Sequence, residues 1–232
     1  MLNEPAVNRT TFEKRPWIKI CGLTEPDNAL ACAKLRPDAL GLVFYEKSPR
    51  HVTMDQAARI TKVLPRHILT IGVFVDNGFK DIMKKVKGCA LKGVQLHGKE
   101  PPDLVEQLKK EHLFVIKALF AAKEPYLSRA KEYSTASALL VEYGKGILPG
   151  GNAESWNYEL SCRIDTKCPI IIAGGLSPMN AAEAVMAARP FGVDVSSGVE
   201  KIPGLKDIDK VNAFIARVES LTNLSIRPDR QV

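Results

Sequence analysis

The sequence lacks the features that mark membrane, secreted and metal-binding proteins. No stretch approaches about 18 uninterrupted apolar residues, which argues against a membrane span. The N-terminus, from Met1 to Arg15, is polar and of mixed charge, with no apolar segment typical of a secretory signal. The five cysteines are odd in number and form no C-x-x-C pair. They indicate reduced thiols in a cytoplasm, and they argue against a disulfide framework or a zinc site.

The sequence also has no basic patch typical of nucleic-acid binding, although its formal net charge is +7. The densest cluster of lysines, from Lys84 to Lys92, has no interleaved aromatic residue and indicates a solvated helix face. We therefore predict no nucleic-acid partner and no membrane partner. The positive charge fits a small substrate that carries phosphate and carboxylate groups.

Short apolar, β-branched runs recur along the chain, and their starts lie roughly 20 to 30 residues apart. This spacing accommodates a strand and a crossover helix, and it is too long for hairpins. Eight such units predict a single-domain α/β protein, a (β/α)8 TIM barrel over residues 15–222, with tails at 1–14 and 223–232. An open doubly wound sheet is the alternative, but no G-x-G-x-x-G motif follows the first run. The predicted strands are Trp17–Ile20, Ala39–Phe44, Thr70–Val75, Gly93–Leu96, Phe114–Ala118, Ala138–Val141, Ile170–Ala173 and Gly192–Val195.

Segments between these strands have helical periodicity. Met54–Leu64 and Lys206–Ser220 each place apolar residues at the spacing of one helix face. Ser177 and Pro178 supply an N-cap and a proline at the first helical position, which predicts a helix over Met179–Ala188.

Alternation within the strands places polar side chains at their ends. In a barrel, alternate residues face the interior and the others face the helices. Cys21, His97 and Glu142 fall on the polar faces of the first, fourth and sixth strands, and each follows its strand at the C-terminal end. Barrel enzymes place their chemistry at this end. The sequence therefore predicts three functional side chains, from separate strands, at one barrel mouth.

Eight short motifs occur in order along the chain. They are Lys19–Thr24, Gly41–Phe44, Ser48–Arg50, Gly72–Val75, Val94–Gly98, Ala173–Leu176, Gly192–Glu200 and Gly204–Asp207. Together they resemble the phosphoribosylanthranilate isomerase family over almost the whole chain, from about Trp17 to Ile215. One motif alone is a weak signal, whereas eight in register at barrel spacing are a specific one.

The resemblance implies an Amadori rearrangement of N-(5-phosphoribosyl)anthranilate, a phosphorylated aminosugar of tryptophan biosynthesis. A general acid opens the furanose ring, a general base takes a proton from the adjacent sugar carbon, and the enolamine becomes an aminoketose. Acid–base chemistry of this kind uses no metal and no cofactor, and we predict none. The chain is expected to be a monomer or a homodimer.

The resemblance also implies roles for particular residues. Cys21 matches the general base, and the Lys19 ammonium on the same strand face is expected to lower the pKa of its thiol. Arg50 matches the arginine that binds the anthranilate carboxylate, which a guanidinium grips with two N–H groups. His97 and Asp194 match active-site positions, and we predict that they, like Lys19, belong to the substrate-binding set.

Glycines and serines after the last two strands match the phosphate site of the family. Gly174 and Gly175 follow the seventh strand, and Ser196, Ser197 and Gly198 follow the eighth. Glycine lets backbone N–H groups approach phosphate oxygens, and serine hydroxyls donate as well. The loops after these two strands hold phosphate in many barrels, so we predict a phosphate site here.

The chain departs from the family around the sixth strand. The family carries an aspartate there as the general acid, and Glu142 stands in its place, followed by the altered segments Pro149–Ala153 and Ser155–Asn157. The double glycine keeps its distance from the strand, so we predict Glu142 as the general acid. Two alternatives stay open. One is the related isomerase of histidine biosynthesis or a dual-substrate form, and the other is a barrel that binds a sugar phosphate without turnover.

Overall fold

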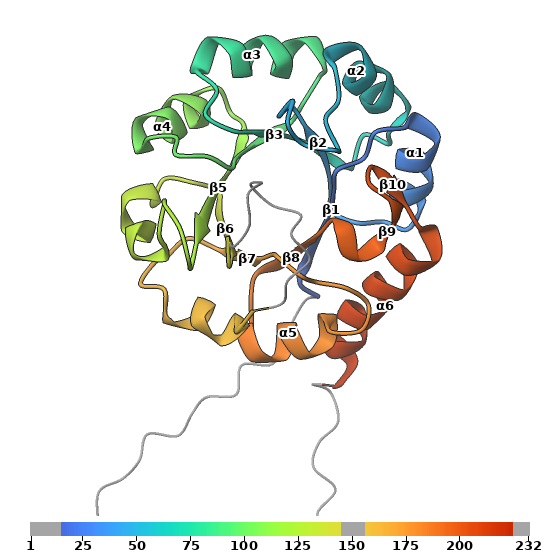
Figure 1. Cartoon of the computed structure of the whole chain (residues 1–232), viewed down its shortest axis with the longest axis vertical. Coiled ribbons are helices and arrows are strands. Elements are labelled where there is room, and N and C mark those ends of the chain that lie inside the picture. The colour runs from blue at the N-terminus through green and yellow to red at the C-terminus, as the bar shows by residue number, and fades with distance from the viewer. Residues whose placement is uncertain (1–14, 145–155, 225–232) are drawn as a thin grey trace, which may run out of the picture.

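The computed structural model describes residues 15–144 and 156–224 and confirms the predicted (β/α)8 barrel. Eight parallel strands close in chain order, because β1 pairs with both β2 and β8. Figure 1 looks down the barrel, with the strands around its centre and the helices outside them. The strands are β1 (Trp17–Cys21), β2 (Ala39–Val43), β3 (Leu69–Phe74), β4 (Gly93–Leu96), β5 (Phe114–Phe120), β6 (Ala138–Glu142), β7 (Ile170–Ile172) and β8 (Gly192–Val195).

Helices cover the outside of this barrel. The described α-helices are α1 (Pro26–Lys34), α2 (Met54–Val63), α3 (Phe79–Gly88), α4 (Pro102–Lys110), α5 (Ala181–Ala188) and α6 (Ile208–Leu224). After β5 and β6 the chain forms 3-10 helices instead, η1 (Leu127–Tyr133) and η2 (Tyr158–Arg163). Between β8 and α6 lie a 3-10 turn, η3 (Ser197–Val199), and a hairpin of β9 (Glu200–Ile202) and β10 (Leu205–Lys206).

Alternation along the strands sorts the apolar side chains into two clusters. Ile18 and Ile20 face outward and are fully buried against the helices. Ile71, Ile116 and Ile171, from the alternate strands β3, β5 and β7, belong to a second buried cluster. Branched side chains from alternate strands fill a barrel interior in such layers. The site therefore begins above this layer, where polar side chains stand at the strand ends.

Helix α5 begins at Ala181, two positions later than the predicted start at Met179. Ser177 lies in a turn before the helix, where its backbone N–H donates to Asn180 Oδ1 at 2.8 Å. Its carbonyl accepts from the Asn180 N–H at 3.3 Å and from the Ala181 N–H at 3.0 Å, so a turn precedes the regular α-helix, which begins at Ala181. Ser177 Oγ also accepts the Met179 N–H at 3.3 Å, so Ser177 makes the predicted capping contact in the turn that leads into α5.

Helix α6 begins at Ile208 and ends at Leu224, whereas the sequence pattern predicts Lys206–Ser220. Asp207 Oδ1 accepts the backbone N–H groups of residues 209 and 210 and caps the helix there. The helix thus runs two residues past the predicted domain end at 222, while the segments 1–14 and 225–232 lie outside the described residues. Within the described part of the chain, no helix combines the length and the hydropathy needed to cross a membrane.

Candidate active site

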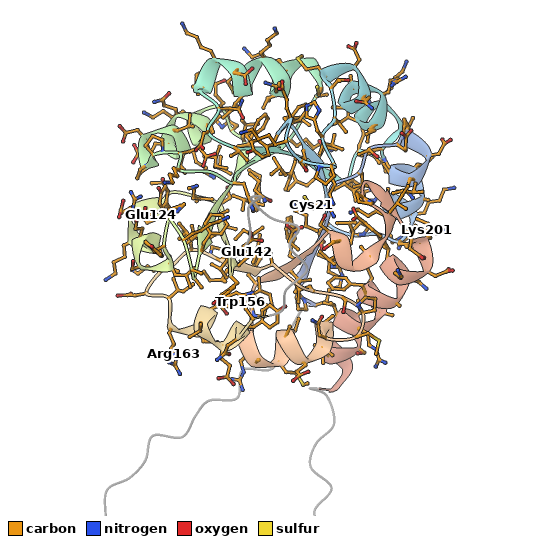
Figure 2. All side chains as sticks on the ribbon, viewed as in Figure 1. Cys21, Glu124, Glu142, Trp156, Arg163 and Lys201 are labelled. Carbon is orange, nitrogen blue, oxygen red and sulfur yellow. The ribbon has the colours of Figure 1, made fainter. Side chains whose placement is uncertain are left out.

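The carboxyl ends of the strands surround a cavity of about 710 Å³, its open mouth included. Figure 2 places Cys21, Glu142 and Trp156 toward the centre of the barrel view, and Glu124, Arg163 and Lys201 near its rim. Most of the predicted site residues line this cavity. They are Cys21, Arg50, His97, Glu142, Gly174, Gly175, Asp194, Ser196 and Ser197.

Two predicted site residues, Lys19 and Gly198, stand behind this lining. Lys19 is fully buried, and its Nζ donates to both carboxylate oxygens of Asp194, at 2.9 and 3.0 Å. The pairing of β1 with β8 sets the two residues directly opposite each other. At Gly198, a Cβ would lie 1.9 Å from the carbonyl oxygen of Leu176, so glycine lets the two loops pack together. Lys19 therefore acts on the cavity through Asp194 and Cys21.

The Cys21 thiol is enclosed by backbone and by charged groups. Gly41 on β2 makes room for it, because a Cβ at that position would lie 2.7 Å from Sγ. Burial raises the pKa of the thiol above its ordinary value, and Asp194 adds to this rise, while Lys19 opposes it by charge and by a hydrogen bond. Lys19 thus lowers this pKa as expected, but the net pKa is raised, because desolvation of the thiolate outweighs the ammonium.

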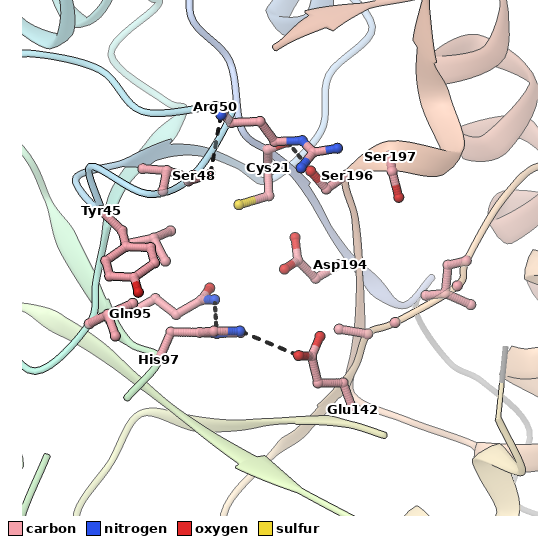
Figure 3. A pocket seen from close by; sticks show the side chains of 17 residues that line it. Cys21, Tyr45, Ser48, Arg50, Gln95, His97, Glu142, Asp194, Ser196 and Ser197 are labelled. Carbon is pink, nitrogen blue, oxygen red and sulfur yellow. Dashed lines mark hydrogen bonds and ion pairs between the residues drawn. The ribbon is translucent and has the colours of Figure 1, made fainter. Parts of the chain in front are cut away.

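Glu142 lies on the other side of Asp194 from Cys21 in Figure 3 and faces His97. Its Oε1 lies 3.4 Å from His97 Nε2, while His97 Nδ1 lies 3.0 Å from Gln95 Nε2. A separation of 3.4 Å is long for a hydrogen bond, and within the described residues His97 Nε2 has no hydrogen-bond partner. Because a buried polar atom normally has a partner, His97 Nε2 is suited to a bound substrate.

Arg50 follows β2 and lines the cavity on the side of Cys21 and Ser196 (Figure 3). Its Nε and Nη2 donate to the two carboxylate oxygens of Glu200, at 2.9 and 2.7 Å. Its aliphatic stem passes over Gly22, which has a φ of +82° and where a Cβ would lie 2.5 Å from Arg50 Cδ. The position of the Arg50 side chain therefore requires glycine at position 22, because the backbone has a positive φ there and a Cβ would collide with Arg50.

The loops after β7 and β8 form one wall of the cavity. Gly174 and Gly175 have φ values of +84° and +66°, the left-handed region that glycine adopts most readily. Ser196 Oγ donates to the carbonyl oxygen of Cys21 at 3.0 Å, which joins the β8 loop to the end of β1. The predicted phosphate loops thus face the same cavity as the predicted base.

Several residues of the site were not singled out by the sequence. Tyr45, Ser48 and Gln95 line the cavity, and Glu200 and Lys206 pair behind Arg50. Gln95 shares the polar face of its strand with His97, so strand alternation did carry a signal for it. Glu200 and Lys206 lie within two of the family motifs, and no local pattern connects either of them with Arg50.

A thiol, a carboxyl group and an arginine thus converge on the C-terminal mouth of a closed parallel barrel, while the described residues contain no group of three possible metal ligands. The fold and the site define an enzyme of the (β/α)8-barrel class. The profile of the family described as N-(5'phosphoribosyl)anthranilate (PRA) isomerase matches residues 18–217. The chain belongs to this isomerase family of tryptophan biosynthesis.

Known relatives agree with this assignment. The N-(5'-phosphoribosyl)anthranilate isomerase of Desulfatibacillum aliphaticivorans is 47% identical over 198 residues, which cover 85% of this chain and 90% of the relative. A crystal structure of phosphoribosyl anthranilate isomerase with reduced 1-(o-carboxyphenylamino)-1-deoxyribulose 5-phosphate has a TM-score of 0.77 at 35% identity, covering 88% of this chain and 99% of the other. Monomers of the dimeric Thermotoga maritima enzyme give 0.76 at 33% identity, with the same two coverages.

Proposed function

We propose that the chain converts N-(5-phosphoribosyl)anthranilate into 1-(2-carboxyphenylamino)-1-deoxyribulose 5-phosphate, with Glu142 as general acid and Cys21 as general base. The observation that carries this proposal is their placement in one cavity, beside a wall of glycine and serine loops. The relative solved with a reduced form of this product supports the same class of phosphorylated ligand.

The reaction needs one proton donor and one proton acceptor on the sugar. Protonated Glu142 gives its proton to the furanose ring oxygen as the C1–O bond breaks, and the nitrogen lone pair forms an iminium. The Cys21 thiolate then takes the proton from C2, and the released electron pair neutralises the iminium to give an enolamine. This enolamine gains a proton at C1 and loses its hydroxyl proton, which yields the ketone. The protons gained and lost balance, as in ordinary acid–base catalysis.

The protonation state of the Cys21 thiol determines what Lys19 must do for catalysis. Burial raises the pKa of Cys21, so the thiolate is the less populated form in neutral solution. The Lys19 ammonium lowers the free energy of that form, and Asp194 holds the ammonium in place through both carboxylate oxygens. In this arrangement Lys19 favours the charged form of the base and Asp194 positions Lys19, without direct contact between Lys19 and the substrate.

Substrate binding divides between two walls of the cavity. Arg50 is suited to the anthranilate carboxylate, and the loops containing Gly175 and Ser197 are suited to the phosphate. His97 Nε2, which has no hydrogen-bond partner among the described residues, lies 3.4 Å from Glu142 Oε1 and is suited to a polar group of the substrate. These assignments agree with the burial, charge and position of each group.

The oligomeric state and the compartment remain predictions. The Thermotoga maritima relative is described as dimeric. For this chain we propose a monomer or a homodimer in the cytoplasm, and analytical ultracentrifugation of the full chain distinguishes the two states.

A fluorescence assay tests the proposal. Purified protein should consume phosphoribosylanthranilate with loss of its fluorescence, at the same rate with and without a chelator, and should leave the aminoaldose of histidine biosynthesis unchanged. Turnover that a chelator abolishes and a divalent ion restores contradicts the cofactor-free mechanism. Binding without turnover favours the non-catalytic barrel, and turnover of both substrates favours a dual-substrate enzyme.

A further inference from the structure

Glu200 stands directly behind the arginine that is suited to the substrate carboxylate. It is separated from Arg50 by 150 positions in the sequence, yet its two carboxylate oxygens accept Nε–H at 2.9 Å and Nη2–H at 2.7 Å. Both side chains are nearly buried, with 11% of Arg50 and 6% of Glu200 exposed. A two-pronged arginine–carboxylate pair fixes the plane of the guanidinium as well as its position.

Among the described residues, Glu200 is the hydrogen-bond partner of the Arg50 side chain, so the rest of the guanidinium is available there. A guanidinium has five N–H bonds, on Nε, Nη1 and Nη2. Glu200 takes the side edge, made of Nε–H and one Nη2–H. The end edge remains, with one hydrogen on each of Nη1 and Nη2, and it has the geometry to accept a second carboxylate with two parallel hydrogen bonds. Glu200 therefore orients Arg50 without occupying the edge that a ligand needs.

A third charge keeps this cluster positive. Lys206 Nζ lies 2.7 Å from Glu200 Oε1, and its side chain is fully buried. Burial by itself raises the pKa of Glu200, but the bonds from Arg50 and the charge of Lys206 bring it below its ordinary value. Two cations and one anion leave a net charge of about +1 beside the cavity, which favours a carboxylate ligand on Arg50.

The hairpin that carries Glu200 is anchored to the start of the barrel. The Gly204 N–H donates to Glu200 Oε1 at 3.1 Å, and Thr24 Oγ1 donates to the Gly204 carbonyl at 3.0 Å. Asn28 on α1 exchanges two hydrogen bonds with the backbone of Lys206, at 2.9 and 2.8 Å. Figure 1 shows β9 and β10 between α1 and α6. Glu200 is thus presented to Arg50 by an element with its own fixed contacts.

We propose that Glu200 is a positioning residue for substrate specificity: it fixes the end edge of Arg50 toward the cavity, so that the enzyme selects a ligand with a carboxylate on its aromatic ring. The inference rests on the proposed function, because it takes the anthranilate carboxylate as the ligand of Arg50. It assigns to the β9–β10 hairpin a role in recognition that the acid–base chemistry does not require.

Two probes separate this role from a structural one. The first is the reduced product analogue with a carboxyphenylamino group, and the second is the same phosphate ester with a phenylamino group. Calorimetry on the full chain gives their affinity ratio, which reports the contribution of the carboxylate. In the Glu200→Gln variant this ratio should fall about tenfold or more, while the affinity for the phenylamino ester stays within about twofold of wild type. The KM should rise with little change in kcat, because the carboxylate is remote from the reacting carbon.

Arg129 and Glu132 provide a matched control, since they form the same two-pronged pair, at 2.9 and 2.6 Å, on an exposed surface. Glu132→Gln should leave the affinity ratio unchanged. In an Arg50→Ala background, Glu200→Gln should have little further effect on the ratio, because the residue through which it acts is gone. Glu200→Asp, which keeps the charge but shortens the side chain, should give an intermediate ratio and serves as the test if the Gln variant does not fold.

An unchanged ratio in Glu200→Gln, or in Glu200→Asp where that variant is the test, overturns the inference. An equal loss of affinity for both probes overturns it too, since it indicates general damage to the cavity. These outcomes are distinct from failure of the proposed function, which is absence of phosphoribosylanthranilate turnover by the wild-type chain.

Discussion

On the β1–β8 side of the cavity, the groups around Cys21 are charged and paired, whereas on the β4–β6 side Glu142 faces His97, whose other ring nitrogen meets the Gln95 amide. Lys19 binds Asp194 at 2.9 Å and Arg50 binds Glu200 at 2.7 Å on the first side. On the second side, the described contact of Glu142 is the 3.4 Å approach to His97 Nε2.

The two sides meet opposite electrostatic demands. A cysteine base works as an anion, so cations near Cys21 lower the free energy of its active form. A general acid works with its proton attached, and a neighbouring fixed cation favours its loss. An acid and a base in one cavity therefore need separate environments. The comparison predicts that the base depends most on the charged groups near Cys21. It predicts that the acid depends most on the proton of Glu142.

Removal of the acid should give the largest effect. Glu142→Gln keeps the shape of the side chain and removes its proton, so turnover should fall by about 10⁴-fold, the upper range for a positioned acid or base. Glu142→Asp keeps the proton with a shorter reach and should retain partial activity. Steady-state fluorescence kinetics measure both variants. Normal turnover in the Gln variant would transfer the acid role to another group, with Asp194 the first to test.

Removal of the base should give the second-largest loss of turnover. Cys21→Ala should lower kcat by about 10²–10⁴-fold while the fold stays intact, because the cavity loses one sulfur atom and no ion pair. Circular dichroism with a thermal melt checks the fold, and Cys32→Ala, which removes a buried thiol within α1, is the control for loss of a cysteine as such. Near-normal kcat in Cys21→Ala would remove the thiol from the mechanism.

Replacement of the arginine proposed to bind the carboxylate should have a smaller effect, on KM and not on kcat. Arg50→Ala should raise KM about 10- to 100-fold with little change in kcat, since a charge-assisted hydrogen-bonded contact contributes about 1.5–3 kcal/mol to ground and transition states alike. Initial rates over a wide substrate range separate the two constants. A fall in kcat at unchanged KM would contradict ground-state binding by Arg50.

The smallest effect concerns the pH dependence of the base. Since burial raises the pKa of Cys21, alkylation of its thiol should accelerate as pH rises from neutral into the alkaline range. Asp194 also raises this pKa, so in Asp194→Asn the increase in the alkylation rate of Cys21 should occur at lower pH. Peptide mass spectrometry follows iodoacetamide at Cys21, with the exposed Cys162 in the same samples as the internal reference. If the increase occurred at higher pH instead, the loss of the Asp194 contact that positions Lys19 would outweigh the loss of the negative charge of Asp194.

The sequence by itself determined the barrel and the residues at its mouth. Strand spacing, the twofold alternation of polar side chains and the turn-forming glycines are properties of neighbouring residues, so Cys21, Glu142 and the loop glycines could be recognised from local pattern. The helices after β5 and β6 were less predictable, because the chain there forms 3-10 turns. The start of α5 lies two residues later than predicted, because the residues after Ser177 form a capped turn before the regular helix.

Only the tertiary structure decided how the site residues are charged and held. Lys19 meets Asp194 across 175 positions because β1 and β8 close the barrel in that register, and Arg50 meets Glu200 across 150 positions through the β9–β10 hairpin. The pKa of Cys21 is raised, whereas the sequence led us to expect a lowered value. Burial depends on everything packed around the thiol, and its effect outweighs that of one adjacent lysine. Local pattern specifies which groups stand at a strand end, whereas desolvation and long-range pairing set their protonation and orientation.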